Sequence, residues 1–154
     1  CAAHGLTAIH NMDGNLYTLE LLEELQRRGQ LTARVRVPFH MKNFMDLSML
    51  EKASKMAARY NSDMLQSGFV KVFVDGVVDS ATAVMVEDYA DQPGWRGDPL
   101  FTPENFARVA VEADRRGLQI AVHAIGDGAV RKELTLVRDG AAWRIVAERT
   151  LEVL

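Results

Sequence analysis

The sequence predicts an α/β fold built from alternating βα units with parallel strands. Short apolar runs alternate with amphipathic segments along the chain, an order whose crossover connections make neighbouring strands parallel. The strongest candidate strand, residues 69–74, is β-branched and aromatic and follows a glycine. The candidate strands are apolar on both faces, as expected of strands covered by helices. The alternation alone does not separate an open doubly wound sheet from a barrel segment.

Two helices and two further strands are expected before this central strand. Residues 6–10 are a short apolar run, and residues 33–39 alternate apolar and polar side chains with the period of two that strands show. Leucines at helical spacing predict a helix over residues 18–28. A similar apolar stripe predicts a second helix over residues 46–60.

The second half of the chain begins with a long loop. Residues 77–101 contain Pro-Gly and Gly-Asp-Pro turns, and loops of this length inside a domain are usually functional. Thr102 as N-cap and Pro103 at the first helical position predict a helix that runs to Arg116. The elements expected after it are a strand at residues 118–124, a helix at 129–137 and a final strand at 143–147.

Length and composition predict one partial domain over residues 1–154, without a separate second domain. Hydrophobic residues make up 48% of the chain and charged residues 25%, a mixture that can form a sizeable core. A closed barrel of eight βα units needs about 250 residues. The chain opens on Cys1 just before an apolar run and ends on Leu154 without a polar tail, so we expect an internal fragment.

Charge and cysteine content narrow the class of partner. The net charge of −3 and the scattered basic residues argue against a nucleic-acid or anionic-membrane surface. No apolar run reaches the roughly 18 residues of a membrane span. Cys1 alone can form no intrachain disulfide, which fits a reducing compartment. We therefore expect a cytoplasmic protein with no nucleic-acid or membrane partner.

Polar residues near the carboxyl ends of the expected strands are the candidates for chemistry, because parallel α/β folds place their sites there. They are His10, His40, Lys71, Asp75 and His123. Lys71 is flanked by apolar residues, so it must pair with a carboxylate such as Asp75, reach solvent, or be carboxylated to bridge two metal ions. His123 lies in an apolar run and is either a hydrogen-bonded core residue or a metal ligand.

The Gly126-Asp127-Gly128 turn is a further candidate. A turn of this kind between a strand and a helix either binds an anion through backbone amides or carries its aspartate as an N-cap. It matches neither the GxGxxG pattern nor the P-loop.

Four stretches of the sequence carry a family resemblance. They are residues 5–12 (GLTAIHNM), 70–76 (VKVFVDG), 80–83 (SATA) and 123–130 (HAIGDGAV). Together they resemble amidohydrolase family 3, in its YtcJ-like branch, over roughly residues 5–132.

The resemblance implies a partial TIM-type (β/α) barrel and a hydrolase that cleaves non-peptide, amide-type C–N bonds with a metal-activated water. The cofactor would be a divalent metal ion, usually zinc, which polarises the substrate carbonyl and lowers the pKa of the attacking water. By position, Lys71 and His123 match metal ligands, and Lys71 and Asp75 are the expected catalytic residues. Asp75 and Asp127 also match positions that shape such a site.

The sequence departs from the family pattern at several points. Its histidines, at positions 4, 10, 40 and 123, form no HxH pair, and residues 144–149 (RIVAER) lack the family's Glu-His pair. The late aspartate that acts as general base in the family would lie beyond Leu154. A catalytic zinc needs about three protein ligands, and this sequence offers two.

Three hypotheses follow from these observations. In the first, the chain is part of an amidohydrolase that becomes active when a longer chain or a second copy completes the barrel. In the second, it is an inactive, truncated fragment that self-associates into a homo-oligomer through its open strand edges. In the third, it is a small α/β module that binds a phosphorylated ligand at the turn of residues 126–128.

Overall fold

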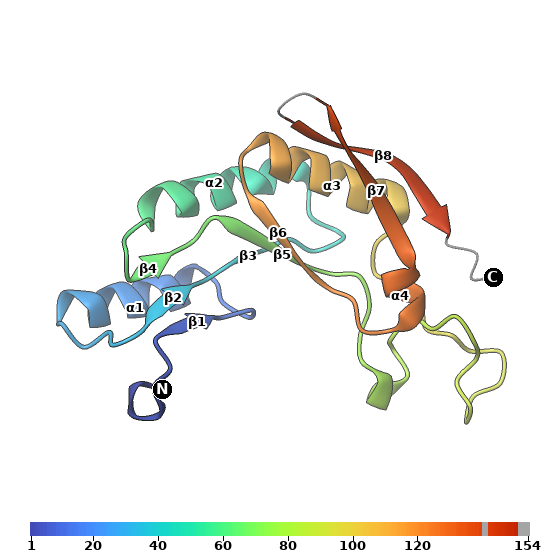
Figure 1. Ribbon diagram of the computed structural model, residues 1–154, viewed down its shortest axis with the longest axis horizontal. Coiled ribbons are helices and arrows are strands. Elements are labelled where there is room, and N and C mark those ends of the chain that lie inside the picture. Colours follow the sequence, from blue (N-terminus) through green and yellow to red (C-terminus); the bar gives the residue numbers. More distant parts are fainter. Residues whose placement is uncertain (140–141, 151–154) are drawn as a thin grey trace.

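The computed structural model describes residues 1–139 and 142–150, with side chains as far as residue 130 (Figure 1). Its helices and strands are β1 (Ala8–His10), α1 (Leu16–Arg27), β2 (Arg34–Arg36), β3 (Phe39–His40), α2 (Leu50–Arg59), β4 (Leu65–Gln66), β5 (Phe69–Phe73), α3 (Pro103–Arg115), β6 (Gln119–His123), α4 (Asp127–Arg131), β7 (Lys132–Asp139) and β8 (Ala142–Thr150). Short 3₁₀ turns are η1 (Ala2–His4), η2 (Leu47–Met49) and η3 (Val78–Ser80). Within the described residues, no helix has the length and apolar character needed to cross a membrane.

Two nearly continuous stretches of chain form the middle of a curved parallel sheet. β2 leads directly into β3, and β4 leads directly into β5. β1 pairs with β2 and β2 with β4, while β3 pairs with β5 and β5 with β6, all in parallel register. The expected α/β fold with alternating βα units and parallel strands is confirmed. The sheet curves as one part of a barrel does (Figure 1).

The single strand expected at residues 33–39 is divided into β2 and β3 by a bulge in the neighbouring stretch. At the division, residues 37–38 face residues 67–69, so one side holds an extra residue. Pro38 has no amide hydrogen to donate to a ladder. Gly68 adopts φ +115°, a conformation that side-chain-bearing residues rarely reach, and this fixes the position of the bulge.

The outer face of the sheet packs against α1, α2 and α3. Val70 and Val72 of β5 are fully buried there, as is Leu50 of α2. Alternate strand residues meet the apolar stripes of the helices, and this burial is the main driving force for folding. One core cluster contains Met41, Leu50, Ala53, Val70, Val72, Phe101, Val109, Ala113 and Leu118. The other contains Leu19, Val35, Val37, Met56, Tyr60 and Leu65.

The concave face of the sheet is basic and aromatic, which corrects the expectation that the strands are apolar on both faces. Lys71 and Phe73 alternate with the buried valines of β5, so they project from the opposite side. The rings of His40 and His123 lie beside Phe73 on that same side. The strongest strand of the sequence therefore separates an apolar core from a surface able to carry chemistry.

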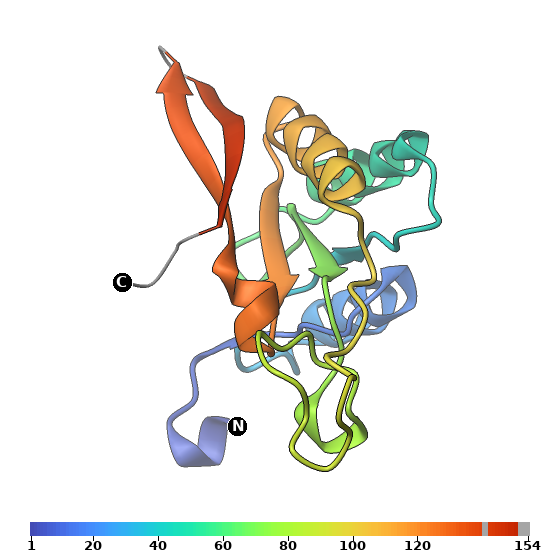
Figure 2. The same cartoon turned by 90° about the vertical axis from the view of Figure 1, so that its right-hand side faces the viewer.

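An antiparallel hairpin follows α4, where a longer helix was expected. α4 ends at Arg131, so the helix predicted at residues 129–137 is wrong beyond that point. β7 pairs with β8 in antiparallel register, and β8 contains the strand predicted at residues 143–147. Backbone pairing between the two strands outweighs the local helical spacing. The hairpin lies beside α3 (Figures 1 and 2).

Candidate functional site

The carboxyl ends of β3, β5 and β6 bring basic and aromatic side chains together on the concave face. Parallel register places His40 beside Lys71 and Phe73 beside His123. The centroid of the Phe73 ring lies 5.8 Å from that of His40 and 4.8 Å from that of His123. Because β5 lies between β3 and β6, Phe73 separates the two imidazoles. Sequence reasoning missed Phe73, although its spacing of two from Lys71 indicates a shared face.

Lys71 is buried on this face. Its side chain is 8% exposed, and its Nζ lies 4.9 Å from the centroid of the Phe73 ring, within range of a cation–π contact. Among the side chains that the structure describes, no carboxylate forms an ion pair with Lys71, so the pairing considered with Asp75 is not formed. Burial lowers the pKa of Lys71, so its neutral amine forms more readily than that of an exposed lysine.

His123 is held by a backbone carbonyl at the end of β5. Its Nε2 lies 2.8 Å from the oxygen of Gly76. A carbonyl oxygen can only accept, so Nε2 carries the proton and Nδ1 keeps its lone pair. Histidines that ligate metal ions are commonly oriented by such a hydrogen bond on the other ring nitrogen.

The other two candidate histidines differ from each other in their surroundings. His40 donates from Nε2 to the Met12 carbonyl at 3.1 Å, and its Nε2 lies 3.9 Å from the exposed carboxylate of Asp13. His10 is exposed, with its ring 6.1 Å from that of Phe69. His40 therefore lies at the rim of the site beside Phe73, whereas His10 lies on the same face beside Phe69.

Asp75 is fully enclosed, and backbone amides surround its carboxylate. One oxygen accepts from Ile125 at 2.9 Å, and the other accepts from Val84 at 2.9 Å and Gly126 at 2.8 Å. The residue is 1% exposed. These contacts join the end of β5 to the 77–101 loop and to the turn after β6. The Asp75 carboxylate therefore has a structural role here.

The Gly126-Asp127-Gly128 turn is packed against the 77–101 loop (Figure 2). Asp127 accepts the amide of Val86 at 2.9 Å, and the amide of Ala129 donates to the Val84 carbonyl at 3.1 Å. A side chain at Gly126 or Gly128 would overlap the loop backbone. The amide of Gly126 is already used by a carboxylate, so the turn offers little to a phosphate.

The described residues alone do not fit a complete divalent-metal site. In the part of the chain that the structure describes, no group of three or more His, Cys, Asp or Glu side chains is gathered. His123 keeps one imidazole nitrogen available, and Phe73 separates it from His40. The arrangement can supply one or two ligands, and a catalytic zinc needs about three.

Comparison with known sequences gives the family. A family model described as the amidohydrolase family matches residues 1–148. The chain is 29% identical over 142 residues to YtcJ of Bacillus subtilis (strain 168), named as a candidate amidohydrolase, a match that covers 89% of the chain and 26% of that protein. It is 43% identical over 68 residues to the Arabidopsis thaliana protein LONG AFTER FAR-RED 3, covering 44% of the chain and 12% of that protein.

Solved structures agree with this match. An uncharacterized metal-dependent hydrolase from Pyrococcus horikoshii OT3 superposes with a TM-score of 0.69 at 28% identity, over 84% of this chain and 26% of that one. A second one, from Pyrococcus furiosus, gives 0.61 at 30% identity, over 80% of this chain and 24% of that one. The chain thus spans about a quarter of these hydrolases. The family match over nearly all of its residues, together with the shared fold, shows that the chain belongs to the amidohydrolase family.

Proposed function

We propose that the chain is part of a metal-dependent hydrolase that uses metal-activated water to cleave non-peptide, amide-type C–N bonds in a small-molecule substrate. One observation carries the proposal. His123 stands at the end of a parallel strand with Nε2 held by the Gly76 carbonyl, which leaves Nδ1 available as a ligand. Membership of the amidohydrolase family supports a divalent ion as the cofactor.

We assign Lys71 and His123 as two ligands of that ion, which we propose to be zinc. When bound, the ion would polarise the substrate carbonyl and lower the pKa of the attacking water. The lowered pKa of Lys71 supports its role, because only a neutral or carboxylated lysine can bind a metal. The remaining ligands and a general base would come from polypeptide outside the described residues.

The contacts favour a positioning role for Asp75 over direct participation in catalysis. Its carboxylate accepts three backbone amides, and the next residue, Gly76, holds His123. The catalytic role expected for Asp75 stays a prediction. Asp127 also holds the 77–101 loop, because its carboxylate accepts the amide hydrogen of Val86.

The remaining expectations have less support. The phosphate-binding hypothesis has little support, because the Gly126 amide already donates to Asp75 and the loop fills the space at the turn. A homo-oligomer stays a prediction, as does a cytoplasmic location, which depends on the single free cysteine, Cys1.

Zinc titration of the chain, purified without chelator, tests the ligand assignment. The described residues offer two ligands, so we expect weak but saturable zinc binding, weakened further by His123→Ala and by Lys71→Met. His4→Ala is the matched control, because His4 is exposed in η1, and it should bind zinc as the wild type does. A His123→Ala variant that binds zinc as tightly as the wild type contradicts the assignment.

The bond class needs a separate measurement. In an assembly that supplies the remaining ligands and the general base, zinc-loaded protein should release amine from small N-acyl compounds, and its His123→Ala variant should not. Hydrolysis of matched esters with no release of amine from the N-acyl compounds would contradict the proposed C–N specificity.

A further inference from the structure

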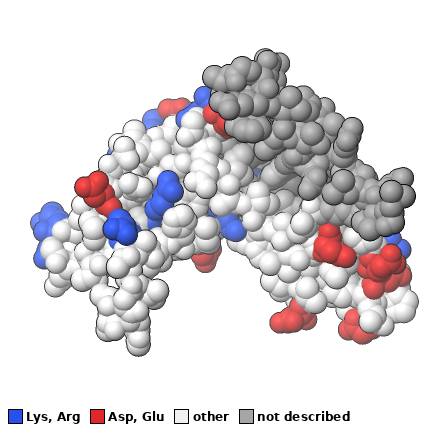
Figure 3. All heavy atoms as spheres, in the orientation of Figure 1, with Lys and Arg blue, Asp and Glu red and all other residues white. Residues whose placement is uncertain are grey.

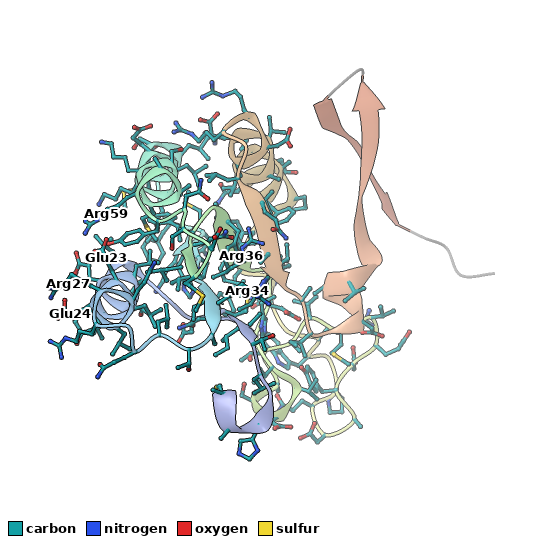
Figure 4. All side chains as sticks on the ribbon, turned by 60° about the vertical axis from the view of Figure 1, so that its left-hand side comes forward. Glu23, Glu24, Arg27, Arg34, Arg36 and Arg59 are labelled. Carbon is teal, nitrogen blue, oxygen red and sulfur yellow. The ribbon has the colours of Figure 1, made fainter. Side chains whose placement is uncertain are left out.

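A cavity lies between α1 and α2, on the helix side of the sheet. Its volume is about 950 Å³, within the roughly 300–1,000 Å³ that small-molecule sites occupy. Figure 4 shows the two helices end-on and side by side, with the labelled Arg59 and Glu23 between them. Phe39 lines the cavity, is in register with the buried Val70, and packs against both core clusters. The floor of the cavity is therefore on the core side of the sheet, away from Lys71.

The inner part of the cavity is apolar and adaptable. Met45 and Met56 line it together with Phe39, and Leu16 lines it where α1 begins. Methionine is unbranched and flexible, so such a lining can adjust to an apolar body of variable shape. Leu16 is 45% exposed, so a ligand here would remove apolar surface from water, which is favourable.

Basic side chains line the same cavity. Lys52, Lys55 and Arg59 follow one another at spacings of three and four residues, so they lie along one side of α2. Lys42, which follows β3, is a further basic lining residue. Among the described residues that line the cavity, only Asp13 is acidic, and its side chain is 96% exposed. The cavity therefore attracts anions rather than cations.

The two ends of the cavity differ in how their charges are paired. Lys42 follows β3 and Lys52 lies in the first turn of α2, and neither forms an ion pair among the side chains that the structure describes. At the other end of α2, Arg59 pairs with Glu23 at 2.8 Å. Burial, and then the Glu23 carboxylate, raise the pKa of Tyr60 at that end. An anion is therefore attracted to the Lys42 and Lys52 end, because a carboxylate already occupies the other.

The N-terminus of α1 adds to the positive end of the cavity. Gly14, Asn15 and Leu16 line the cavity where this helix begins. The first turn of α1 contains no acidic side chain, so no residue of that turn neutralises the positive end of the helix dipole. The helix dipole and the two lysines thus favour the same kind of group, a negatively charged one.

We propose that the cavity between α1 and α2 binds a small amphipathic carboxylate, with its apolar body on the methionine-lined floor and its carboxylate toward Lys42, Lys52 and the N-terminus of α1. A neutral apolar molecule would leave the lysines unpaired, and a cation would meet like charges. On the face that Figure 3 shows, acidic side chains gather at the lower right, over the 77–101 loop and away from α1 and α2. The proposal depends neither on metal binding nor on the proposed hydrolysis.

Octanoate, octanol and octyltrimethylammonium test the proposal, because they share an apolar chain and differ in charge. Each is titrated below the concentration at which it aggregates. We expect octanoate to bind saturably, about tenfold or more tighter than the other two, with an affinity that falls as salt is added. Adsorption to apolar surface alone would instead favour octanol, whose head group is less costly to remove from water. Acetate, which lacks the apolar body, should not bind.

The methyl signals of methionine in NMR spectra give the position of bound octanoate. Met45 and Met56 line the cavity, so their signals should shift during the titration. Met85 lies in the 77–101 loop, and its signal should not shift.

Lysine variants test the head-group contacts. Lys42→Gln and Lys52→Gln should each weaken octanoate binding about threefold, because each removes one ion pair at an exposed position. Octanol binding should stay unchanged in both. Arg108→Gln, which removes one positive charge from an exposed position on α3, is the matched control and should bind octanoate as the wild type does.

Leu16→Asp places a carboxylate in the cavity itself and should weaken octanoate binding about tenfold or more. An acidic residue in the first turn of a helix interacts favourably with the helix dipole, so the loss would not come from unfolding of α1. Tyr17→Asp is the matched control, because Tyr17 is 67% exposed in the same turn and does not line the cavity. It should weaken octanoate binding far less.

Four results would overturn the proposal. They are no saturable binding of octanoate, octanol binding as tightly as octanoate, unchanged octanoate binding in the double variant of Lys42→Gln and Lys52→Gln, and a shift of the Met85 signal in place of those of Met45 and Met56. The second result would indicate a purely apolar occupant, and the last two would place the bound anion elsewhere on the chain.

Discussion

The carboxylate of Asp75 accepts the amide hydrogen of Gly126 at 2.8 Å, across 51 residues of sequence. The same side chain accepts amides from the 77–101 loop and from Ile125. Gly76, the next residue, accepts the Nε2 hydrogen of His123. The end of β5 thus holds the loop, the turn after β6 and the candidate ligand in one arrangement.

Asp75→Asn should lower the free energy of unfolding by about 2–4 kcal/mol. The asparagine side chain keeps one acceptor oxygen, but its NH₂ group would face amide hydrogens that it cannot accept. Hydrogen bonds to a charged acceptor are also stronger than those to a neutral one. Urea denaturation followed by circular dichroism measures the change.

Asp79→Asn is the matched control for this variant. Asp79 is exposed in η3 of the same loop, and we expect its substitution to change stability by less than about 0.5 kcal/mol. If the two variants lose the same stability, the three amide contacts of Asp75 do not contribute as described.

Gly126→Ala should destabilise the chain by about 2 kcal/mol or more. The added Cβ would overlap the Val84 carbonyl oxygen and lie 2.5 Å from its carbon, and backbone atoms cannot move aside as a flexible side chain can. Thermal unfolding gives the change, and limited proteolysis should cut within residues 77–101 more readily.

Gly94→Ala supplies the comparison. Gly94 has φ +83° and open space around its Cβ position, so alanine meets only backbone strain there, about 1 kcal/mol. A larger loss at Gly94 than at Gly126 would show that the loop does not press against the turn.

Periodicity predicts those parts of the fold that depend on local sequence. The apolar stripes and the Thr102-Pro103 start located α1, α2 and α3 within a few residues, and the Thr102 side chain does accept the Asn105 amide. The break at Pro38 and the hairpin after α4 were not foreseen. Both depend on strand partners: the bulge at Gly68 lies in the adjacent strand, and β7 is a strand through its pairing with β8.

The candidate site likewise has a part that local sequence predicts and a part that it does not. The period of two in β5 and β6 places Lys71 and His123 on one face, so their proximity could be expected from sequence. The role of Asp75 could not, because its partners are amides 9, 50 and 51 residues away.

Glu112→Gln should reduce the loss of stability that the chain shows in acid. Hydrogen bonds from Arg115 and then Arg116 lower the pKa of Glu112 to about 2. A carboxyl whose pKa is lower in the folded chain than in the unfolded chain stabilises the folded state at pH values above its usual pKa of 4.5. This contribution is lost as the pH falls from 4.5 toward 2. The thermal midpoint between pH 5 and pH 2 should therefore fall less in the variant. Glu104→Gln, in the exposed first turn of α3, should follow the wild type.

Lys71→Met should stabilise the metal-free chain at neutral pH, by an amount on the order of 1 kcal/mol. Burial lowers the pKa of Lys71 in the folded state, so the unfolded chain binds more protons in the window below the ordinary value of 10.5. Wild-type stability should accordingly rise as pH increases through that window, and the methionine variant should lack this rise. Urea midpoints at pH 7 and pH 9.5 measure both effects. Lys52→Met, at an exposed site on α2, should keep the wild-type dependence, and parallel curves for wild type and Lys71→Met would mean that Lys71 is solvated or paired in solution.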